Sequence, residues 1–245
     1  MNAKVSVADT LIVIPTYQER DNLRSLVHEV HRNAPAAHVL VVDDNSPDGT
    51  GALAETLARA DARVHVLQRP KKLGLGSAYV AGFGWGLSRG YQRFLEMDCD
   101  FSHDPAELFR FFAALDAGAD VVVGSRNVPG GRIEGWGLGR LALSKGGSAY
   151  ARAVLGIAVR DLTTGYKAFT RRALEELGLS RVRSNGYSFQ IETTYRALGA
   201  GFRVVEVPIT FVDRRVGRSK MNRRIFYEAV AVVWRLRFEA LRELR

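Results

Sequence analysis

The chain has 245 residues, of which 47% are hydrophobic and 25% charged, as in an ordinary globular protein with one large domain or two fused ones. Its single cysteine, Cys99, excludes an internal disulfide framework and a multi-cysteine zinc site, and no apolar run approaches the roughly 18–20 residues that span a bilayer. The net charge is +9, and residues 203–245 hold 11 Lys and Arg against 5 Asp and Glu, so we expect a polyanionic partner: nucleic acid, acidic lipid head groups or phosphorylated substrates.

Short apolar runs bounded by turn residues recur along the first two thirds of the chain and again near residue 205. They lie at 11–15, 38–44, 63–67, 94–98, 120–125 and 202–209. Because the runs are continuous rather than alternating, they predict strands that are buried on both faces. Helical patterns are found between them, at about 21–33, 51–60, 77–89 and 105–117. This alternation predicts an α/β fold with a doubly wound, mostly parallel sheet.

The helix expected at 105–117 carries its own start signal. Asp104 is predicted to be the N-cap, Pro105 the first helical residue and Glu107 the acid of a capping box.

After residue 125 the pattern becomes less regular. The Gly-rich stretch 126–140 predicts a mobile loop, and further helices are expected at about 140–155, 171–178 and 187–198. Residues 222–245 have a helical period, with Val233 and Trp234 on the apolar face and Arg235 opposite. We therefore expect a C-terminal amphipathic helix, whose apolar face either packs against the sheet or meets a bilayer.

Acidic residues follow two of the predicted strands: Asp43 and Asp44 after the second, and Asp98 and Asp100 after the fourth. Ligands of open parallel sheets bind beyond the carboxyl ends of the strands. Side chains two residues apart share one side of an extended segment, so Asp98 and Asp100 could hold Mg²⁺ or Mn²⁺ on a diphosphate, with Cys99 pointing into the core. Taken alone, each acidic pair also fits a turn or a helix cap.

Other nucleotide-binding motifs are missing from the sequence. No G-x-G-x-x-G follows the first strand, where Pro15 and Tyr17 stand instead, and no G-x-x-x-x-G-K-[ST] is present, which excludes a P-loop. His103 lies beside the predicted metal site, but no partner acid is evident, so we do not assign it as a base.

A set of motifs in a fixed order resembles the dolichol- and polyprenol-phosphate mannose synthases, which are inverting GT-A glycosyltransferases. The motifs are "IPTYQERDNL", "VVDDNSPDGT", "GLGSAYVAGF", "MDCDFSHDP", "VVGSR", "GWGLGRLALSKGGSAYARAVLG", "RDLTTGYKAF" and "EVPITFVDRRVGRSKM". The resemblance implies one GT-A domain at 1–221, with a Rossmann-like nucleotide-sugar half at 1–105 and an acceptor half at 106–221, followed by the amphipathic helix at 222–245. The family's usual D-A-D reads Asp98-Cys99-Asp100 here, and its third ligand position is Ser102.

The resemblance also implies roles for individual residues. The nucleotide sugar would be bound by Pro15, Tyr17, Glu19, Val42, Asp43, Asp44, Asp98, Cys99, Asp100, Arg214 and Lys220. The metal, Mg²⁺ or Mn²⁺, would be held by Asp98, Asp100 and Ser102, and the acceptor phosphate by Arg126, Arg140 and Ser144. The catalytic residues would be Asp98, Asp100 and Arg126.

The implied reaction moves mannose from GDP-mannose to a polyprenyl (dolichyl-type) monophosphate with inversion. Such an acceptor is already an anionic nucleophile, so no strong base is required. Two alternatives stay open: the same chemistry with UDP-glucose, and a nucleic-acid-binding module, which the lack of a recognised motif and the acidic strand ends disfavour. We expect a peripheral protein on the cytoplasmic side of a membrane, without signal peptide or transmembrane helix, and a membrane-anchoring partner protein is compatible with this.

Overall fold

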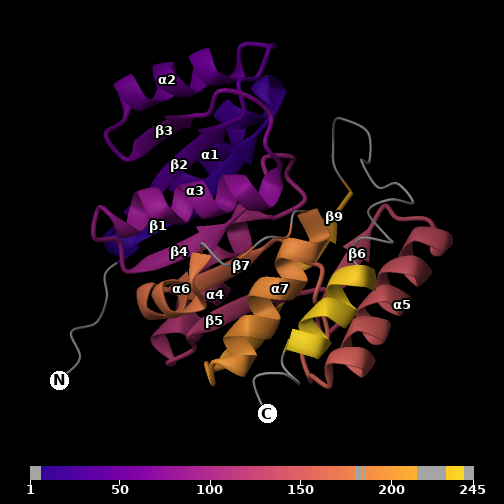
Figure 1. Ribbon diagram of the computed structural model, residues 1–245. Coiled ribbons are helices and arrows are strands. Elements are labelled where there is room, and N and C mark those ends of the chain that lie inside the picture. The colour runs from indigo at the N-terminus through magenta and orange to yellow at the C-terminus, as the bar shows by residue number, and fades with distance from the viewer. Residues whose placement is uncertain (1–6, 180–181, 183, 185, 214–229, 240–245) are drawn as a thin grey trace.

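A seven-stranded sheet in the order β3-β2-β1-β4-β7-β5-β8 runs through the computed structural model, with helices on both faces (Figure 1). The structure describes residues 7–179, 182, 184, 186–213 and 230–239. The strands of this sheet are β1 Thr10–Thr16, β2 His38–Asp43, β3 Val64–Gln68, β4 Arg93–Glu96, β5 Val121–Ser125, β7 Lys167–Thr170 and β8 Val204–Pro208. The α-helices are α1 Arg20–Asn33, α2 Thr50–Ala60, α3 Leu75–Leu87, α4 Leu108–Asp116, α5 Leu138–Leu155, α6 Arg171–Leu177 and α7 Gly186–Gly199. These elements confirm the predicted α/β class and the mostly parallel sheet.

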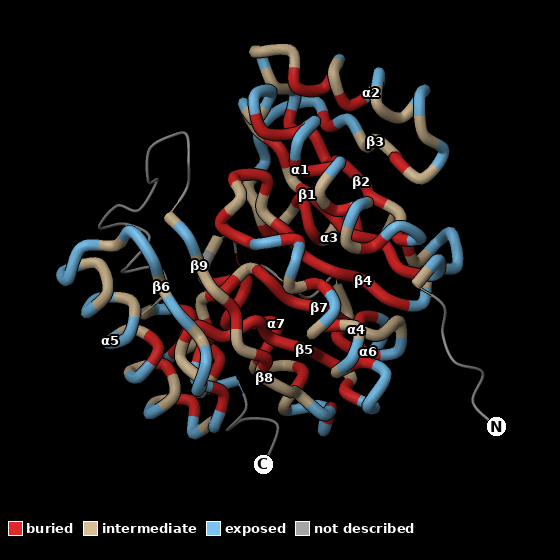
Figure 2. Tube along the Cα trace, turned by 180° about the vertical axis from the view of Figure 1, so that it is seen from behind, coloured by how far each residue is buried: buried red, intermediate tan, exposed pale blue. Residues whose placement is uncertain are grey.

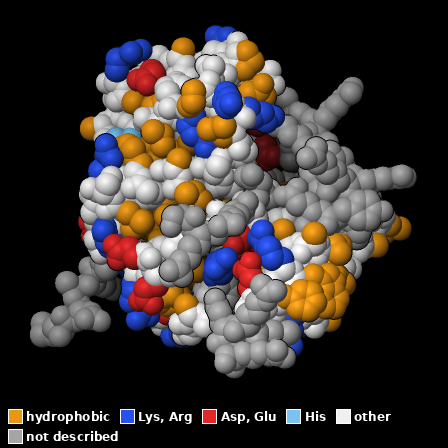
Figure 3. Space-filling view, viewed as in Figure 1, with side chains coloured by type: hydrophobic (Ala, Val, Ile, Leu, Met, Phe, Trp, Pro, Cys, Tyr) orange, Lys and Arg blue, Asp and Glu red, His pale blue; other side chains and the backbone are white. Residues whose placement is uncertain are grey.

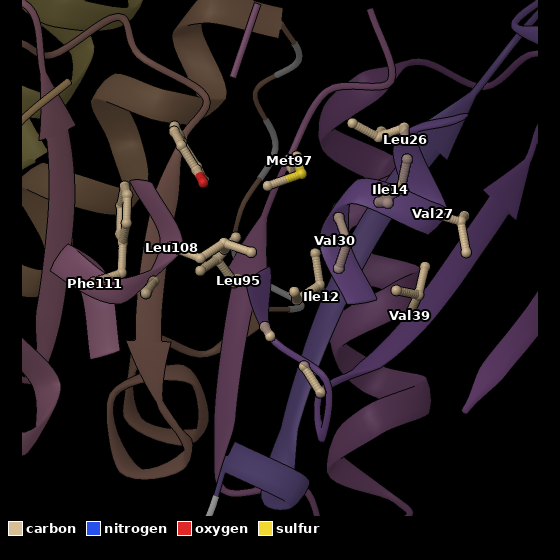
Figure 4. Packing of buried hydrophobic residues seen from close by; sticks show 14 of the residues in the cluster. Ile12, Ile14, Leu26, Val27, Val30, Val39, Leu95, Met97, Leu108 and Phe111 are labelled. Carbon is tan, nitrogen blue, oxygen red and sulfur yellow. The ribbon is translucent and has the colours of Figure 1, made fainter. Parts of the chain in front are cut away.

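The sheet separates two apolar clusters because side chains alternate along each buried strand. In β1, Ile12 and Ile14 point to the side covered by α1 and α4, where Phe111 also packs (Figure 4). Leu11 and Val13 point to the other side, which α3, α6 and α7 cover. The central strands are buried at nearly every residue, as the red tube in Figure 2 shows.

One strand of the seven-stranded sheet was not predicted. β7 comes from the "GYKAF" part of a motif that showed no apolar run, yet it lies in the middle of the sheet. It is antiparallel to both β4 and β5, and it pairs Lys167 with Glu96. Burial on both faces was also wrong for β3, where only Val64 is buried, because β3 forms an edge of the sheet.

The stretch 126–140 is more ordered than predicted. Within it, β6 Arg132–Glu134 pairs in parallel with β9 Thr210–Val212 to form a second, two-stranded sheet. The capping box was also wrong. Asp104 does accept a hydrogen bond from the N–H of Ala106, but the Glu107 carboxylate accepts from the N–H of Thr210 at 2.9 Å. Glu107 therefore ties β9 to the start of α4, after a 3₁₀ turn at Pro105–Glu107.

The described part of the C-terminal segment, residues 230–239, is helical. Its Val233 is buried in a third apolar cluster with Leu155 of α5 and Ile191 of α7, whereas Trp234 is 46% exposed. The two residues that we expected on one face are thus divided between the core and the surface. Arg235 reaches the buried carboxylate of Glu192 at 3.2 Å. Among the described helices, none is long and apolar enough to span a bilayer.

Gly82 lets α3 lie directly against the sheet. A Cβ built at this position would be 2.5 Å from Cγ1 of Val13, whereas a Cβ at Gly84, on the exposed side of the same helix, would meet nothing within 4 Å. Gly82→Ala is expected to lower the free energy of unfolding by about 1–3 kcal/mol through overpacking. Gly84→Ala, the matched control, should raise it by about 0.5–1 kcal/mol, because alanine favours the helix. Urea denaturation measures both values, and equal effects of the two substitutions would contradict the close packing of α3.

Candidate active site

A cavity of about 420 Å³ opens at the edge of the sheet where parallel strands end. Residues that follow β1, β2, β4 and β5 line it, as expected for a ligand site in an open parallel sheet. In Figure 3 an acidic side chain lies deep in a hollow that has Lys or Arg side chains near its rim. The predicted site residues that line the cavity are Pro15, Tyr17, Glu19, Asp44, Asp98, Cys99, Asp100, Ser102, Arg126 and Arg140.

Other predicted residues do not reach this cavity. Val42 lies in the apolar cluster under α3 and is fully buried. Asp43 is buried as well, and its carboxylate accepts hydrogen bonds from Thr16 Oγ1 at 2.8 Å and from Ser46 Oγ at 2.6 Å. Val42 packs in the core, and Asp43 stabilises the turn after β2, so contact of these two residues with a nucleotide stays a prediction. Arg214 and Lys220 lie outside the described residues.

Asp98 and Asp100 both line the cavity, just past the end of β4. The hydroxyl of Tyr79, on α3, donates to Asp98 Oδ1 at 3.2 Å. The backbone turns back after Asp100 because Phe101 has a left-handed conformation, with φ of +61°. This turn and the Tyr79 contact hold two carboxylates in one wall of the cavity.

Ser102 supports Asp100 from behind. Its hydroxyl and its backbone N–H both donate to Asp100 Oδ1, at 2.6 and 3.1 Å, and its side chain is almost fully buried. The hydrogen bonds from Ser102 orient the Asp100 carboxylate, whatever further contact Ser102 makes with a ligand.

Cys99 and His103 are packed rather than reactive. Burial raises the pKa of the Cys99 thiol well above its usual value, as expected for the small apolar residue that we predicted. His103 is buried and stacks on Tyr166 with ring centroids 4.8 Å apart, and its Nδ1 accepts the N–H of Asp98 at 3.0 Å. Burial lowers the pKa of His103 to about 4, so the ring is neutral near pH 7.

One end of the cavity is built by the loops after β1 and β3. Lys72 lies over the ring of Tyr17, with Nζ 3.9 Å from the ring centroid. Asp44 accepts from the N–H of Leu73 at 3.0 Å and forms a buried ion pair with Arg69. An aromatic ring, a lysine and an anchored carboxylate suit a base and a ribose.

The other end of the cavity contains Arg126, which is anchored to Asp161. Nε and Nη2 of Arg126 donate to the two oxygens of the Asp161 carboxylate, each at 2.7 Å, and Nη2 also donates to Thr163 Oγ1 at 2.8 Å. Burial would raise the pKa of Asp161, but the charge and hydrogen bonds of Arg126 more than offset it, so the pKa lies below its usual value. Arg126 therefore presents a rigid guanidinium at the cavity wall.

Arg140, in the first turn of α5, lies over the ring of Trp136 with the guanidinium carbon 4.0 Å from the centroid. Its Nη1 donates to both oxygens of Asp213, at 2.9 and 3.0 Å. Ser144, one turn further along α5, is half-buried and does not line the cavity. Its contact with an acceptor phosphate therefore stays a prediction.

Several residues of the cavity floor were not predicted from the sequence. The floor includes Thr163, Thr164 and Gly165, which precede β7, and Ser188 and Gln190 on α7. "TTGY" belonged to a motif that we noticed, but a strand that enters the sheet in reverse gives no apolar run from which its position could be inferred.

The donor set of the cavity fits a divalent cation. Asp98 and Asp100 offer hard carboxylate oxygens, which Mg²⁺ and Mn²⁺ prefer. Within the described residues, no three His, Cys, Asp or Glu side chains form a group that could hold a metal by themselves. A cation at Asp98 and Asp100 would complete its shell with oxygens of a bound diphosphate and water, as is usual for Mg²⁺ at phosphate sites.

A mostly parallel sheet, with two aspartates past a central strand and a cavity at that edge, is the architecture of a GT-A glycosyltransferase. The chain belongs to glycosyl transferase family 2, which it matches over residues 11–178.

Two curated proteins are similar over nearly the whole chain. One is a polyprenol monophosphomannose synthase of Mycolicibacterium smegmatis, 54% identical over 231 residues, which are 93% of this chain and 87% of that protein. The other is an undecaprenyl-phosphate mannosyltransferase of Micrococcus luteus, 48% identical over 95% of this chain and 97% of that protein.

Among solved structures, the chain resembles glucosyl-3-phosphoglycerate synthase from Mycobacterium tuberculosis in complex with Mn²⁺, UDP and phosphoglyceric acid. The TM-score is 0.68 at 17% identity, over 93% of this chain and 78% of that one. A second complex of that enzyme, with Mn²⁺, UDP-glucose and phosphoglyceric acid, gives 0.67 over 97% and 85%. At this identity the likeness establishes the fold.

Proposed function

We propose that the protein transfers mannose from GDP-mannose to a polyprenyl monophosphate, with inversion at the anomeric carbon, and releases GDP. The observation that carries the proposal is the identity of 54%, over 93% of the chain, to a polyprenol monophosphomannose synthase. The aspartate pair and the two arginines in one cavity supply the chemistry that such a reaction requires.

We assign the donor to the half of the cavity between Tyr17 and Asp100. Tyr17, Lys72 and Asp44 would hold the nucleoside, and Asp98 and Asp100 would hold Mg²⁺ or Mn²⁺ on the diphosphate. When bound, the cation neutralises the charge that develops on the departing diphosphate. The chain's own part is to orient the two carboxylates through Tyr79 and Ser102.

We assign the acceptor phosphate to the end of the cavity that holds Arg126 and Arg140. Guanidinium groups bind phosphate oxygens in a planar, bidentate manner, and the Asp161 pair fixes the direction of Arg126. The phosphate attacks as an anion, so positioning and electrostatics supply most of the rate. A neutral, buried His103 agrees with a reaction that needs no protein base.

We place the polyprenyl tail near α5 and the C-terminal helix, at a membrane surface. Leu138 is 85% exposed and Phe238 is 56% exposed, although both are large and apolar. Trp234 stacks on Phe238 with centroids 5.8 Å apart, and aromatic and basic residues are common at bilayer interfaces. This placement keeps the expected peripheral location on the cytoplasmic face, with a membrane-anchoring partner protein compatible with it.

The deciding experiment uses the purified full-length protein, Mn²⁺ or Mg²⁺ and polyprenyl phosphate, in parallel with radiolabelled GDP-mannose and UDP-glucose. Label from GDP-mannose in the solvent-extractable lipid supports the proposal. Label from UDP-glucose alone would make the enzyme a polyprenyl-phosphate glucose synthase. Transfer from neither donor, with salt-sensitive binding of DNA or RNA, would favour a nucleic-acid-binding module instead.

Arg140→Ala is expected to raise the KM for polyprenyl phosphate by about 10- to 100-fold, because charge-assisted hydrogen bonds to the acceptor phosphate are lost. The KM for GDP-mannose should change little. Steady-state kinetics with each substrate varied in turn separates the two effects. Arg89→Ala removes an equal charge from an exposed site at the end of α3 and should leave both constants unchanged. A rise in the donor KM alone would move Arg140 to the donor site.

A further inference from the structure

We propose that the side-chain amide of Gln190 binds a hydroxyl of the donor sugar and so takes part in choosing that sugar. This inference rests on the proposed function, because it concerns the same cavity. Gln190 lies on α7 and was given no role by the sequence motifs. It lines the cavity, although it is only 2% exposed.

The amide of Gln190 has one satisfied end and one unsatisfied end. Nε2 donates to Glu96 Oε2 at 2.7 Å, while Oε1 is buried and has no hydrogen-bond partner among the described residues. A buried amide oxygen without a partner is unfavourable, so such an atom is rarely left unsatisfied. A ligand hydroxyl in the cavity would satisfy it.

Two fully buried ionisable residues hold Gln190 in place. Glu96 on β4 bonds its side chain, and the ammonium of Lys167 on β7 donates to its backbone carbonyl at 2.6 Å. Glu96 and Lys167 are register partners across the antiparallel β4–β7 pair, so both reach α7 from neighbouring positions. Their common contact is Gln190.

Gly165 lies between the side chains of Gln190 and Asp98 in the cavity lining. A Cβ at Gly165 would lie 3.5 Å from Gln190 Nε2 and 3.8 Å from Asp98 Oδ2. The amide and the carboxylate therefore border the same part of the cavity. If Asp98 holds the donor diphosphate, the group next to it in this space is the sugar, since the nucleoside occupies the end with Tyr17.

A sugar hydroxyl matches this amide in either protonation state of Glu96. An ionised Glu96 only accepts, so it takes Nε2 and leaves Oε1 for the sugar. A protonated Glu96 can donate to Oε1, and Nε2 is then the end that faces the sugar. A hydroxyl both donates and accepts, so it bonds to either end.

The test is a mutant cycle between Gln190→Met and donors that each lack one hydroxyl. Methionine keeps the length of the side chain and removes both hydrogen-bonding groups. With whichever of GDP-mannose and UDP-glucose the wild type uses, Gln190→Met should lower kcat/KM by about 10- to 100-fold. One monodeoxy donor should lose a similar factor with the wild type and lose nothing more with the variant. That analogue identifies the hydroxyl.

Binding of GDP and of the intact donor in the presence of Mn²⁺ provides a second readout. Gln190→Met should bind GDP as the wild type does, which shows that it is folded, but should lose the extra affinity that the sugar confers. Gln92→Met is the matched control and should change neither quantity, because Gln92 is exposed and lies before β4, at the end of the strand opposite the cavity.

Independent effects of the variant and of every deoxy donor would overturn the inference, as would a variant that has lost GDP binding together with sugar binding. A wild type that uses neither donor refutes the proposed function itself, and the two failures are thereby distinguished.

Discussion

Asp100→Ala is expected to reduce sugar transfer by about 1,000-fold or more, because the cavity loses one of the two carboxylates that would hold the metal on the leaving diphosphate. The alanine variant should remain folded. Asp100 is at the cavity wall, and its hydrogen bonds with Ser102 lie in a loop rather than in the apolar core. Transfer of labelled mannose into lipid measures the loss.

The same preparation tests the metal directly. Removal of divalent ions with a chelator should abolish transfer by the wild type, and Mn²⁺ or Mg²⁺ should restore it. Isothermal titration should show that GDP binding by Asp100→Ala no longer depends on Mn²⁺. Asp104→Ala is the matched control, since this aspartate is exposed, lies four residues further along and only caps the 3₁₀ turn. Wild-type activity in Asp100→Ala would show that the metal is held elsewhere.

Asp161→Ala is expected to lower the free energy of unfolding by about 3–5 kcal/mol, because it leaves the Arg126 guanidinium buried without its counter-charge. The pair is almost completely buried, with Arg126 4% and Asp161 0% exposed at the side chain, so water cannot replace the lost carboxylate. The variant should also lose most of its activity, because Arg126 is no longer aimed at the acceptor end of the cavity. Chemical denaturation and the transfer assay measure the two losses.

An exposed arginine–carboxylate pair provides the comparison. Arg32 and Glu29 are one turn apart on α1, and Arg32 is 67% exposed at its side chain. Arg32→Ala should cost about 0–1 kcal/mol, as surface pairs usually do, and leave transfer unchanged. If Asp161→Ala lowered the free energy of unfolding and the transfer activity as little as Arg32→Ala, the position of Arg126 would not depend on Asp161. Asp161→Asn keeps the hydrogen-bonding shape without the charge and should fall between the two.

Strands that are continuously apolar were predictable, because a strand buried on both faces needs apolar residues at consecutive positions. This holds for β1, β2 and β5, and the place of Asp98 and Asp100 past β4 followed from it. The antiparallel β7 was not predictable in this way, because its four residues begin with a buried lysine, whose ammonium donates to the backbone carbonyl of Gln190, 23 residues away in the chain.

The site shows the same division. Sequence indicated which residues stand at the strand ends, but Asp43 and Asp44 look alike there, and only the structure turns one toward Thr16 and the other toward the cavity. Likewise, "SFQIE" on α7 reads as an ordinary helix start, and its glutamine becomes a cavity residue only when α7 packs against the sheet.

The sequence by itself determined the fold class, which strands along the chain are followed by acidic residues, and the family. Each of these depends on neighbouring residues or on motifs in a fixed order. The tertiary structure decided which side chains face the cavity and which charges are paired, such as Arg126 with Asp161 across 35 residues. Those outcomes depend on contacts between segments that are distant in the chain, and local composition carries no record of them.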